Sequence, residues 1–367
     1  MKWLDDYRMR LVVVGIVAGI VINVGSVKAD FILGEPTNLG SVVNSGFGEF
    51  DPHLMPDSLS LVFASDRPGG RGLCDLYVTT RNDVKDPWGP PTNLDPEVNS
   101  SNFELDPCLS EDELTLLFVS SRPGSSGFFD IWMTTRSTID APWSNPVNLE
   151  VVNSGSWDMD PSLSKNGLEL YFCSDRSDGH GLFDIWIATR ETLYAEWGAP
   201  VNLSPLINTS RSEHSPCISS DGLTLFFCRG ISYSTANLWI ARRNTLDSAW
   251  KEPKSLGPVV NIMRSNLDPD VSADGLSLFW NSTNTPDNNA SFDIYQAPII
   301  PIVDLNSDGI VDCTDLCVIV DNWGTDNSLC DIGPMPWGDG VVYVEDLIVL
   351  AEHLFEEFPP VDVESVE

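Results

Sequence analysis

Residues 160–190 read "DPSLSKNGLELYFCSDRSDGHGLFDIWIATR", and this stretch decides the fold because its pattern returns along most of the chain. The related stretches each carry one landmark proline, 53 to 55 residues from the next, at Pro52, Pro107, Pro161, Pro216 and Pro269. Self-similarity at a fixed period of this length is typical of repeat architectures. The sequence therefore predicts an array of five related units.

Each unit contains four short segments of strand-like periodicity separated by turn residues. In the third unit they are residues 160–164, 168–174, 183–190 and 197–203. Four antiparallel strands form one propeller blade, so the fold class expected is an all-β propeller of five four-stranded blades. The fifth unit lacks its last segment, whereas residues 34–40 ("GEPTNLG") form a last segment with no unit before it. We expect this N-terminal strand to complete the fifth blade and close the ring.

The units resemble the TolB-type, WD-like β-propeller repeats of bacterial exported proteins. The likeness lies in "DPSLSKNGLELYFCSDR" from Asp160 and "FDIWIATR" from Phe183, and it covers about residues 34 to 298. It implies the propeller fold and says little about activity, because one fold hosts many functions.

The chain is strongly acidic, with 54 Asp and Glu against 20 Lys and Arg and a formal charge of −34. This balance argues against a nucleic-acid partner, which is bound through Lys and Arg. Lys2, Arg8 and Arg10 precede an apolar run that is too short to span a membrane comfortably, so residues 1–29 are expected to be a signal peptide. The mature protein is then secreted, extracellular or at the cell surface, without a membrane span. Asp5 and Asp6 are atypical of such a segment, and the alternative is a retained N-terminal anchor.

Polar residues recur in pairs where each unit begins. Because the first strand of a blade lines the central channel, we expect a carboxylate-rich ring at one mouth that takes a cation or a hydroxylated ligand. The candidates are Glu49, Asp51, Glu104, Asp106, Asp158, Asp160, Glu213 and Asp268. The alternative is structural: the Asp before each proline fixes the turn and pairs with a blade arginine (Arg67, Arg122, Arg176 or Arg229).

Further ion pairs are expected within blades, joining Arg67 to Asp75, Arg122 to Asp130 and Arg176 to Asp184. The repeated tryptophans are expected in the core: Trp88, Trp143, Trp197 and Trp250. Features that do not repeat are better site candidates, namely Trp157, His180, Arg211, His214, Tyr233 and residues 281–290. Among the eight cysteines, Cys108, Cys173, Cys217 and Cys228 are expected as buried thiols, and a bridge from Cys330 to Cys313 or Cys317 is plausible.

Residues 304–315 read "DLNSDGIVDCTD", the spacing of a calcium loop. Hard oxygen ligands are expected from Asp304, Asn306, Asp308, the Ile310 carbonyl, Asp312 and Asp315. A second, less regular loop offers Asp331, Asp339, the carbonyl of Val341 and Asp346. The cofactor expected at both loops is Ca²⁺.

Two loop-and-helix units at the end of an exported chain resemble a type I dockerin, over about residues 304 to 356. The resemblance implies that calcium folds this module and that a helical face binds a cohesin on a scaffold protein. It places the partner contacts at Cys313, Thr314, Val344 and Glu345. Cysteine departs from the usual pattern there, which leaves the class of partner open.

These observations divide the chain into residues 1–29 (signal peptide), 30–298 (propeller), 299–303 (linker), 304–357 (dockerin-like module) and 358–367 (tail). The function expected is that of a secreted calcium-binding protein whose propeller is a non-catalytic recognition or scaffold head in an extracellular polysaccharide-degrading assembly. The alternative is that the propeller is itself a glycoside hydrolase acting on O-glycosyl bonds in polysaccharide catabolism, since paired carboxylates serve that chemistry and are plentiful here. No metal-ligand spacing of histidines and no Gly-x-Ser-x-Gly motif singles out an active site.

Overall fold

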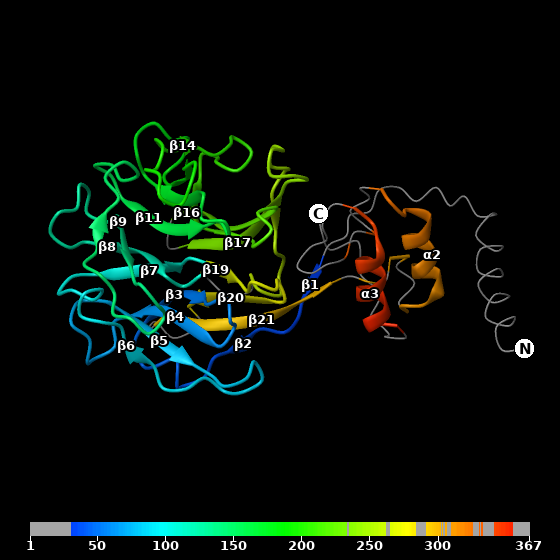
Figure 1. Cartoon of the computed structure of the whole chain (residues 1–367), viewed down its shortest axis with the longest axis horizontal. Helices are drawn as coiled ribbons and strands as arrows, with labels where there is room; N and C mark the ends of the chain where they lie inside the picture. The colour runs from blue at the N-terminus through cyan, green and yellow to red at the C-terminus, as the bar shows by residue number, and fades with distance from the viewer. Residues whose placement is uncertain are drawn as a thin grey trace, which may run out of the picture. The chain divides into compact units, whose positions relative to one another are not determined.

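The computed structural model describes residues 31–232, 235–261, 265–283, 291–301, 303, 305–306, 310–325, 330, 332 and 341–354. The chain divides into two compact units, one formed by Leu33–Ile299 and the other containing Ile300–Glu367. The first unit consists of strands and turns, and the helices α2 and α3 belong to the second (Figure 1).

Four blades are continuous in sequence, and each is a four-stranded antiparallel sheet in which neighbours along the chain pair. Blade 1 contains β3 (Glu49–Leu54), β4 (Ser60–Ser65), β5 (Asp75–Thr80) and β6 (Thr92–Asn93). Blade 2 contains β7 (Glu104–Leu109), β8 (Thr115–Ser120), β9 (Asp130–Thr135) and β10 (Val147–Asn148). Blade 3 contains β11 (Asp158–Leu163), β12 (Glu169–Ser174), β13 (Asp184–Thr189) and β14 (Val201–Asn202). Blade 4 contains β15 (Ser212–Ile218), β16 (Thr224–Ser232), β17 (Thr235–Arg242) and β18 (Lys254–Ser255).

Blade 5 is assembled from both ends of the array. It contains β19 (Asn266–Val271), β20 (Ser277–Ser282) and β21 (Asp293–Pro301), and β21 also pairs with the N-terminal strands β1 (Phe31–Leu33) and β2 (Thr37–Asn38). Thr37 lies opposite Gln296 and Asn38 opposite Tyr295. The prediction that residues 34–40 complete the fifth blade is confirmed, as is the all-β five-bladed propeller.

The innermost strands form a closed ring, because β3, β7, β11, β15 and β19 each contact the next and β19 contacts β3. One asparagine per unit also joins adjacent blades, accepting from a backbone N–H and donating to the carbonyl of the same residue. These pairs are Asn44 with Ile294, Asn99 with Leu76, Asn153 with Ile131, Asn208 with Ile185 and Asn261 with Leu238, at 2.8 to 3.0 Å. The five asparagines thus extend the hydrogen bonding of each sheet to its neighbour.

Four buried ion pairs link the first strand of a blade to the end of its second strand, and they differ from the expected ones. Arg67 pairs with Glu49 at 2.9 Å, Arg122 with Glu104 at 3.2 Å, Arg176 with Asp158, and Arg229 with Glu213 at 2.9 Å. Each acidic partner is fully buried. The arginines also donate to the carbonyls of Val43, Val98, Val152 and Ile207, which precede the blade.

The predicted pairing of Arg67 with Asp75, and its equivalents in blades 2 and 3, is wrong. Asp75 accepts from the backbone N–H groups of Arg71 and Gly72 and from the side chain of Asn93, so it fixes the turn before β5. Asp130 and Asp184 make the same contacts in their blades. Both carboxylates are buried, and the arginine pairs with the one on the first strand of the blade.

The expected core tryptophans are buried, and each lies beneath an arginine guanidinium at 4.2 to 4.7 Å: Trp88 with Arg81, Trp143 with Arg136, Trp197 with Arg190 and Trp250 with Arg243. Cys108, Cys173, Cys217 and Cys228 are buried thiols, as expected. No bridge to Cys330 forms, because this residue is buried with Sγ 3.5 Å from the Val318 carbonyl while Cys313 and Cys317 are exposed on α2.

The C-terminal unit contains α2 (Cys313–Asp321) and α3 (Val344–Glu352), each of nine residues. Ile319 of α2 and Leu350 of α3 lie in one apolar core with Val311 and Val342, which precede the helices. Among the described residues of the chain, no helix combines the length and the apolar character that crossing a membrane requires.

Replacing Arg122 by Met keeps the apolar stem over Phe118 but leaves buried Glu104 without its cation. We expect the free energy of unfolding to fall by about 3–5 kcal/mol, measured by urea denaturation. The control is Lys165→Met, which removes an exposed pair with Glu111 and should cost about 0–1 kcal/mol. Equal losses in the two variants would contradict a structural role for the buried pairs.

Candidate functional site in the central channel

A pocket lies on the propeller axis, and all five blades line it. Each blade contributes the second half of its innermost strand and the following turn, from residues such as Asp51 to Pro56 in blade 1. The cavity has a volume of about 110 Å³. Two rings of side chains, separated by one proline along each strand, form its walls.

The lower ring consists of Asp51, Asp106, Asp160, Ser215 and Asp268. All five residues have positive φ, between 49° and 54°, and each precedes a proline at an irregularity in the strand pairing. Aspartate tolerates this left-handed conformation better than most residues. The five bulges therefore turn equivalent side chains towards the axis, which is where four of the predicted ring residues lie.

Hydrogen bonds join the lower ring from blade to blade. The backbone N–H of Asp106 donates to Asp51 Oδ2 at 3.1 Å, that of Asp160 to Asp106 Oδ2 at 3.0 Å, and that of Ser215 to Asp160 Oδ2 at 2.8 Å. Ser215 Oγ then donates to Asp268 Oδ1 at 2.5 Å. The carboxylates of Asp51, Asp106 and Asp160 thus fix the strained backbone of the next blade.

The upper ring lies two residues further along each strand and consists of His53, Cys108, Ser162, Cys217 and Asp270. Every member accepts from a backbone N–H of the following blade, and the circle is complete. The five bonds are Leu109 to His53 Nε2 (3.1 Å), Leu163 to Cys108 Sγ (3.3 Å), Ile218 to Ser162 Oγ (3.0 Å), Val271 to Cys217 Sγ (3.4 Å) and Leu54 to Asp270 Oδ2 (2.7 Å).

The upper ring also contains a histidine–carboxylate pair, with His53 Nδ1 3.2 Å from Asp270 Oδ1. Because Nε2 accepts from Leu109, the proton of the neutral imidazole lies on Nδ1 and points at the carboxylate. The thiols beside this pair are not nucleophiles at neutral pH, since burial raises the pKa of Cys108 to about 12 and that of Cys217 well above its ordinary value.

Burial and the crowding of like charges raise the pKa values of three lower-ring aspartates, Asp51, Asp106 and Asp268. The pKa of Asp106 and that of Asp268 lie well above the ordinary value, first through burial and then through the neighbouring carboxylates. Burial also raises the pKa of Asp51, against hydrogen bonds from Asp106 and Asp268. Among the described residues that line the pocket, the one Lys or Arg is Lys165, which pairs with Glu111.

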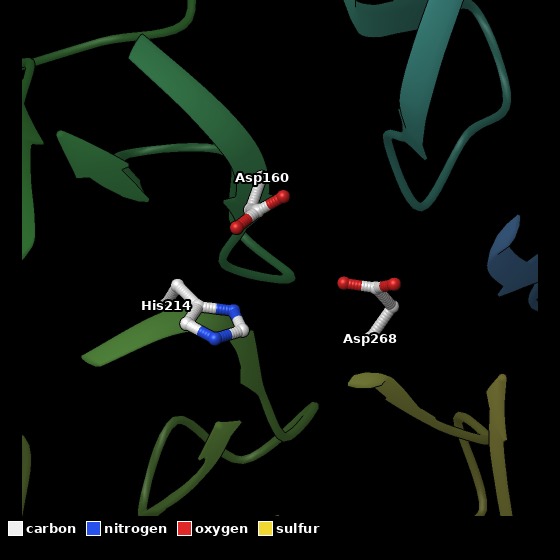
Figure 2. A group of neighbouring side chains, drawn as sticks. All are labelled: Asp160, His214 and Asp268. Carbon is white, nitrogen blue, oxygen red and sulfur yellow. The ribbon is translucent and has the colours of Figure 1, made fainter. Parts of the chain in front are cut away.

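Blade 4 departs from the pattern of the other four. It places Ser215 where they have Asp, and His214 where they have Phe50, Leu105, Met159 and Leu267. His214 is fully buried, and burial lowers its pKa to about 4, so the imidazole is neutral at neutral pH. Figure 2 shows His214 facing the carboxylates of Asp160 and Asp268, and the potential ligand atoms of these three residues lie within 4.8 Å of one another.

The remaining predicted ring residues, Glu49, Glu104, Asp158 and Glu213, are absent from the pocket lining described here and belong to the buried ion pairs. Trp157 is 42% exposed and packs against Phe128 and Phe129 away from the pocket. His180 and Arg211 lie in loops that do not line it either. Tyr233 and residues 284–290 lie outside the described residues, whereas Asn281 and Ser282 are buried in β20.

In the C-terminal unit, the last predicted ligand of each calcium loop lies in the first turn of a helix. Asp315 is buried and accepts from the backbone N–H groups of Leu305, Asn306 and Asp312 at 2.7 to 3.1 Å. Asp346 is buried at the equivalent place in α3 and accepts from those of Ile332 and Tyr343, both at 2.6 Å.

Asp312 caps α2 by accepting from the backbone N–H of Thr314, while Ile310 is exposed and Val341 half-buried. Cys313, Thr314 and Val344 are exposed, and Glu345 follows Val344 in α3. Several predicted residues lie outside the described part of the chain, namely Asp304, Asp308, Asp331 and Asp339, together with residues 1–29 and 358–367.

No family model matches the sequence, and no curated protein matches it significantly. Solved structures of similar fold include a putative TolB from Agrobacterium tumefaciens (14% identity, 74% of this chain and 99% of that one, TM-score 0.45). They also include an α-L-arabinofuranosidase from Lactobacillus brevis (13%, 72% and 94%, 0.49) and the catalytic domain of a Coprinopsis cinerea GH62 α-L-arabinofuranosidase (11%, 74% and 97%, 0.49). Likeness at this level of identity concerns the fold alone.

One functional expectation is corrected by these neighbours. The non-catalytic recognition or scaffold head was the main reading of the sequence, yet arabinofuranosidases and a xylan β-1,4-xylosidase are prominent among the structures of similar fold. That reading is therefore not retained.

The raised pKa values of the lower ring predict how stability depends on pH. The folded protein binds protons at Asp106 more tightly than the unfolded chain does, so the free energy of unfolding should fall as pH rises from about 4 through the raised pKa. Asp106→Asn should flatten this decline and raise the free energy of unfolding at pH 8, by about 1.4 kcal/mol for each unit by which the pKa is raised.

The measurement is urea denaturation from pH 4 to 9 in the presence of a chelator. The control is Asp112→Asn, because the Ser110 hydroxyl lowers the pKa of that exposed carboxyl and its effect has the opposite sign. A decline of equal steepness in the Asp106 variant would contradict a raised pKa at Asp106.

Proposed function

We propose that the propeller is a glycoside hydrolase that cleaves O-glycosyl bonds of a polysaccharide in the central pocket. The observation that carries the proposal is that six carboxylic acid side chains from four blades line one cavity at several depths: Asp51, Asp106, Asp160, Asp268, Asp270 and Glu111. Glycoside hydrolysis requires two such groups on either side of one bond.

The two rings place carboxyl groups on different blades at different depths of one pocket. The two carboxyl groups of glycosidases are about 5–9.5 Å apart. We assign the acid to Asp106, whose pKa is raised by burial and by the neighbouring carboxylates, and the base to Asp270, which His53 holds in the upper ring.

In this arrangement Asp106 transfers its proton to the glycosidic oxygen as the bond from that oxygen to the anomeric carbon breaks. Asp270 accepts a proton from a water molecule whose oxygen forms the new bond to the anomeric carbon. One sugar product leaves with the proton of Asp106, the other carries the water hydroxyl, and a proton returns from Asp270 to Asp106 through solvent.

The test is sugar release by the full chain from aryl α-L-arabinofuranosides, aryl β-D-xylosides, xylan and arabinan. We expect Asp106→Asn and Asp270→Asn each to lower kcat by about 100-fold or more, since general acid and base groups contribute about 10²–10⁴. Glu191→Gln, an exposed residue away from the pocket, is the matched control and should retain full activity. No release by the parent protein, or equal activity in all variants, would contradict the proposal.

A second function is proposed for the C-terminal unit, namely a calcium-folded dockerin that binds a cohesin-bearing scaffold outside the cell. It is supported by the matched places of Asp315 and Asp346, each buried at the start of a nine-residue helix and bonded to its own loop. The donor set consists of carboxylate, amide and carbonyl oxygens, which suits Ca²⁺. Asp304, Asn306, Asp308, Ile310, Asp312 and Asp315 would hold one ion, and Asp331, Asp339, Val341 and Asp346 the other.

When bound, calcium would neutralise the acidic loops and fix the helices, so that the exposed residues Cys313, Thr314 and Val344 are presented with Glu345 to a partner. Calcium titration of the full chain by calorimetry and circular dichroism should show high-affinity binding with a gain of helix. Asp315→Asn should remove one site, whereas Glu191→Gln should remove none. A calcium response unchanged by both Asp315→Asn and Asp346→Asn would contradict this assignment.

A further inference from the structure

We propose that the propeller carries a site for a divalent transition-metal ion, with Zn²⁺ as the first choice, formed by His214, Asp160 and Asp268. The three side chains come from three consecutive blades and face one another beside the channel (Figure 2). This site goes beyond the proposed hydrolase, since metal binding requires no substrate and uses neither Asp106 nor Asp270.

The geometry is that of a converging donor set. The Ser215 hydroxyl is 2.9 Å from His214 Nδ1 and 3.3 Å from Asp160 Oδ2, and it donates to Asp268 Oδ1 at 2.5 Å. One imidazole and two carboxylates therefore converge around the Ser215 hydroxyl, and their potential ligand atoms lie within 4.8 Å of one another. A tetrahedral ion with bonds of about 2.0–2.2 Å keeps its ligand atoms about 3.3–3.6 Å apart, so small rotations of the carboxylates bring the three groups to ligand distance.

The broken repeat is an independent reason to expect a ligand here. The other four blades place an apolar side chain where blade 4 has His214, at a position where the backbone geometry is otherwise the same. Phe, Leu and Met satisfy the packing requirement of this position, so the fold does not need an imidazole. A neutral imidazole next to two carboxylates is a donor set that proteins use for Zn²⁺.

The surroundings favour a borderline-soft ion over Ca²⁺ or Mg²⁺. Cys228 lies directly across the strand pair from His214, and Cys173 Sγ is 3.1 Å from Asp160 Oδ2. Both thiols are fully buried. Nitrogen and sulfur donors beside the carboxylates match the preference of Zn²⁺ or Co²⁺, whereas Ca²⁺ and Mg²⁺ select oxygen donors alone.

The experiment measures Zn²⁺ binding to the full chain by calorimetry and by metal analysis after gel filtration. The background variant is Cys313→Ser with Cys317→Ser, because the two exposed thiols on α2 would bind Zn²⁺ themselves. His214→Phe is the test variant, since Phe occupies the equivalent position at Phe50. His180→Phe, which removes an exposed histidine from a surface loop, is the matched control.

We expect one Zn²⁺ per chain in the background and the control, and a loss of affinity of about 100-fold or more in His214→Phe, because removing a ligand costs at least as much as disturbing the groups behind it. Asp268→Asn should show a similar loss, and it keeps the test decisive if His214→Phe does not fold. A tenfold excess of Ca²⁺ should not displace the ion.

Three outcomes would overturn the proposal. The background variant binds no Zn²⁺, the folded His214→Phe and Asp268→Asn variants bind Zn²⁺ as tightly as the background does, or Ca²⁺ displaces the bound Zn²⁺. Co²⁺ provides a direct check of the ligands, because visible absorption bands typical of nitrogen and oxygen coordination should appear with the background variant and be absent from His214→Phe. Since no sugar is present, these results are independent of whether the propeller hydrolyses glycosides.

Discussion

The structure depends on the hydrogen bond that joins neighbouring blades at the channel. Each lower-ring carboxylate of blades 1 to 3 accepts from a backbone N–H in the next blade, and that N–H belongs to a residue with positive φ. A strained backbone costs about 1–3 kcal/mol per residue unless its surroundings hold it. The ring of acceptors provides this restraint, and it brings four carboxylates together as an unavoidable result of closure.

The charge that closure concentrates on the axis connects the fold to its chemistry. Protons shared within the lower ring, or a cation held beside it, are the two ways to relieve the repulsion between Asp51, Asp106, Asp160 and Asp268. A catalytic or metal site that evolves here starts from Asp51, Asp106 and Asp268, whose pKa values the closed fold already raises. The proposed acid and the proposed metal ligands are different members of this one ring.

The sequence predicted the period, the strands and the closure by residues 34–40, because repetition and strand periodicity survive in the one-dimensional pattern. It did not predict the partner of Arg67, because Glu49 and Asp75 both recur at fixed spacing and both are buried, so only the folded blade shows which carboxylate the arginine reaches. It also missed His53 and Asp270, which do not repeat. The available signal was that the residue two positions after each lower-ring aspartate or serine differs from blade to blade. Only the closed ring shows that these residues lie close together.

The upper ring separates what holds the fold from what determines chemistry. In each blade, the upper-ring side chain accepts from the equivalent backbone N–H of the next blade. The acceptor atom is a nitrogen, a sulfur, a hydroxyl oxygen or a carboxylate oxygen, depending on the blade. Any side chain with an acceptor atom of suitable length meets the architectural requirement. Selection or design can therefore change the reactive group at one upper-ring position at a time, while the hydrogen bond that joins the blades is kept.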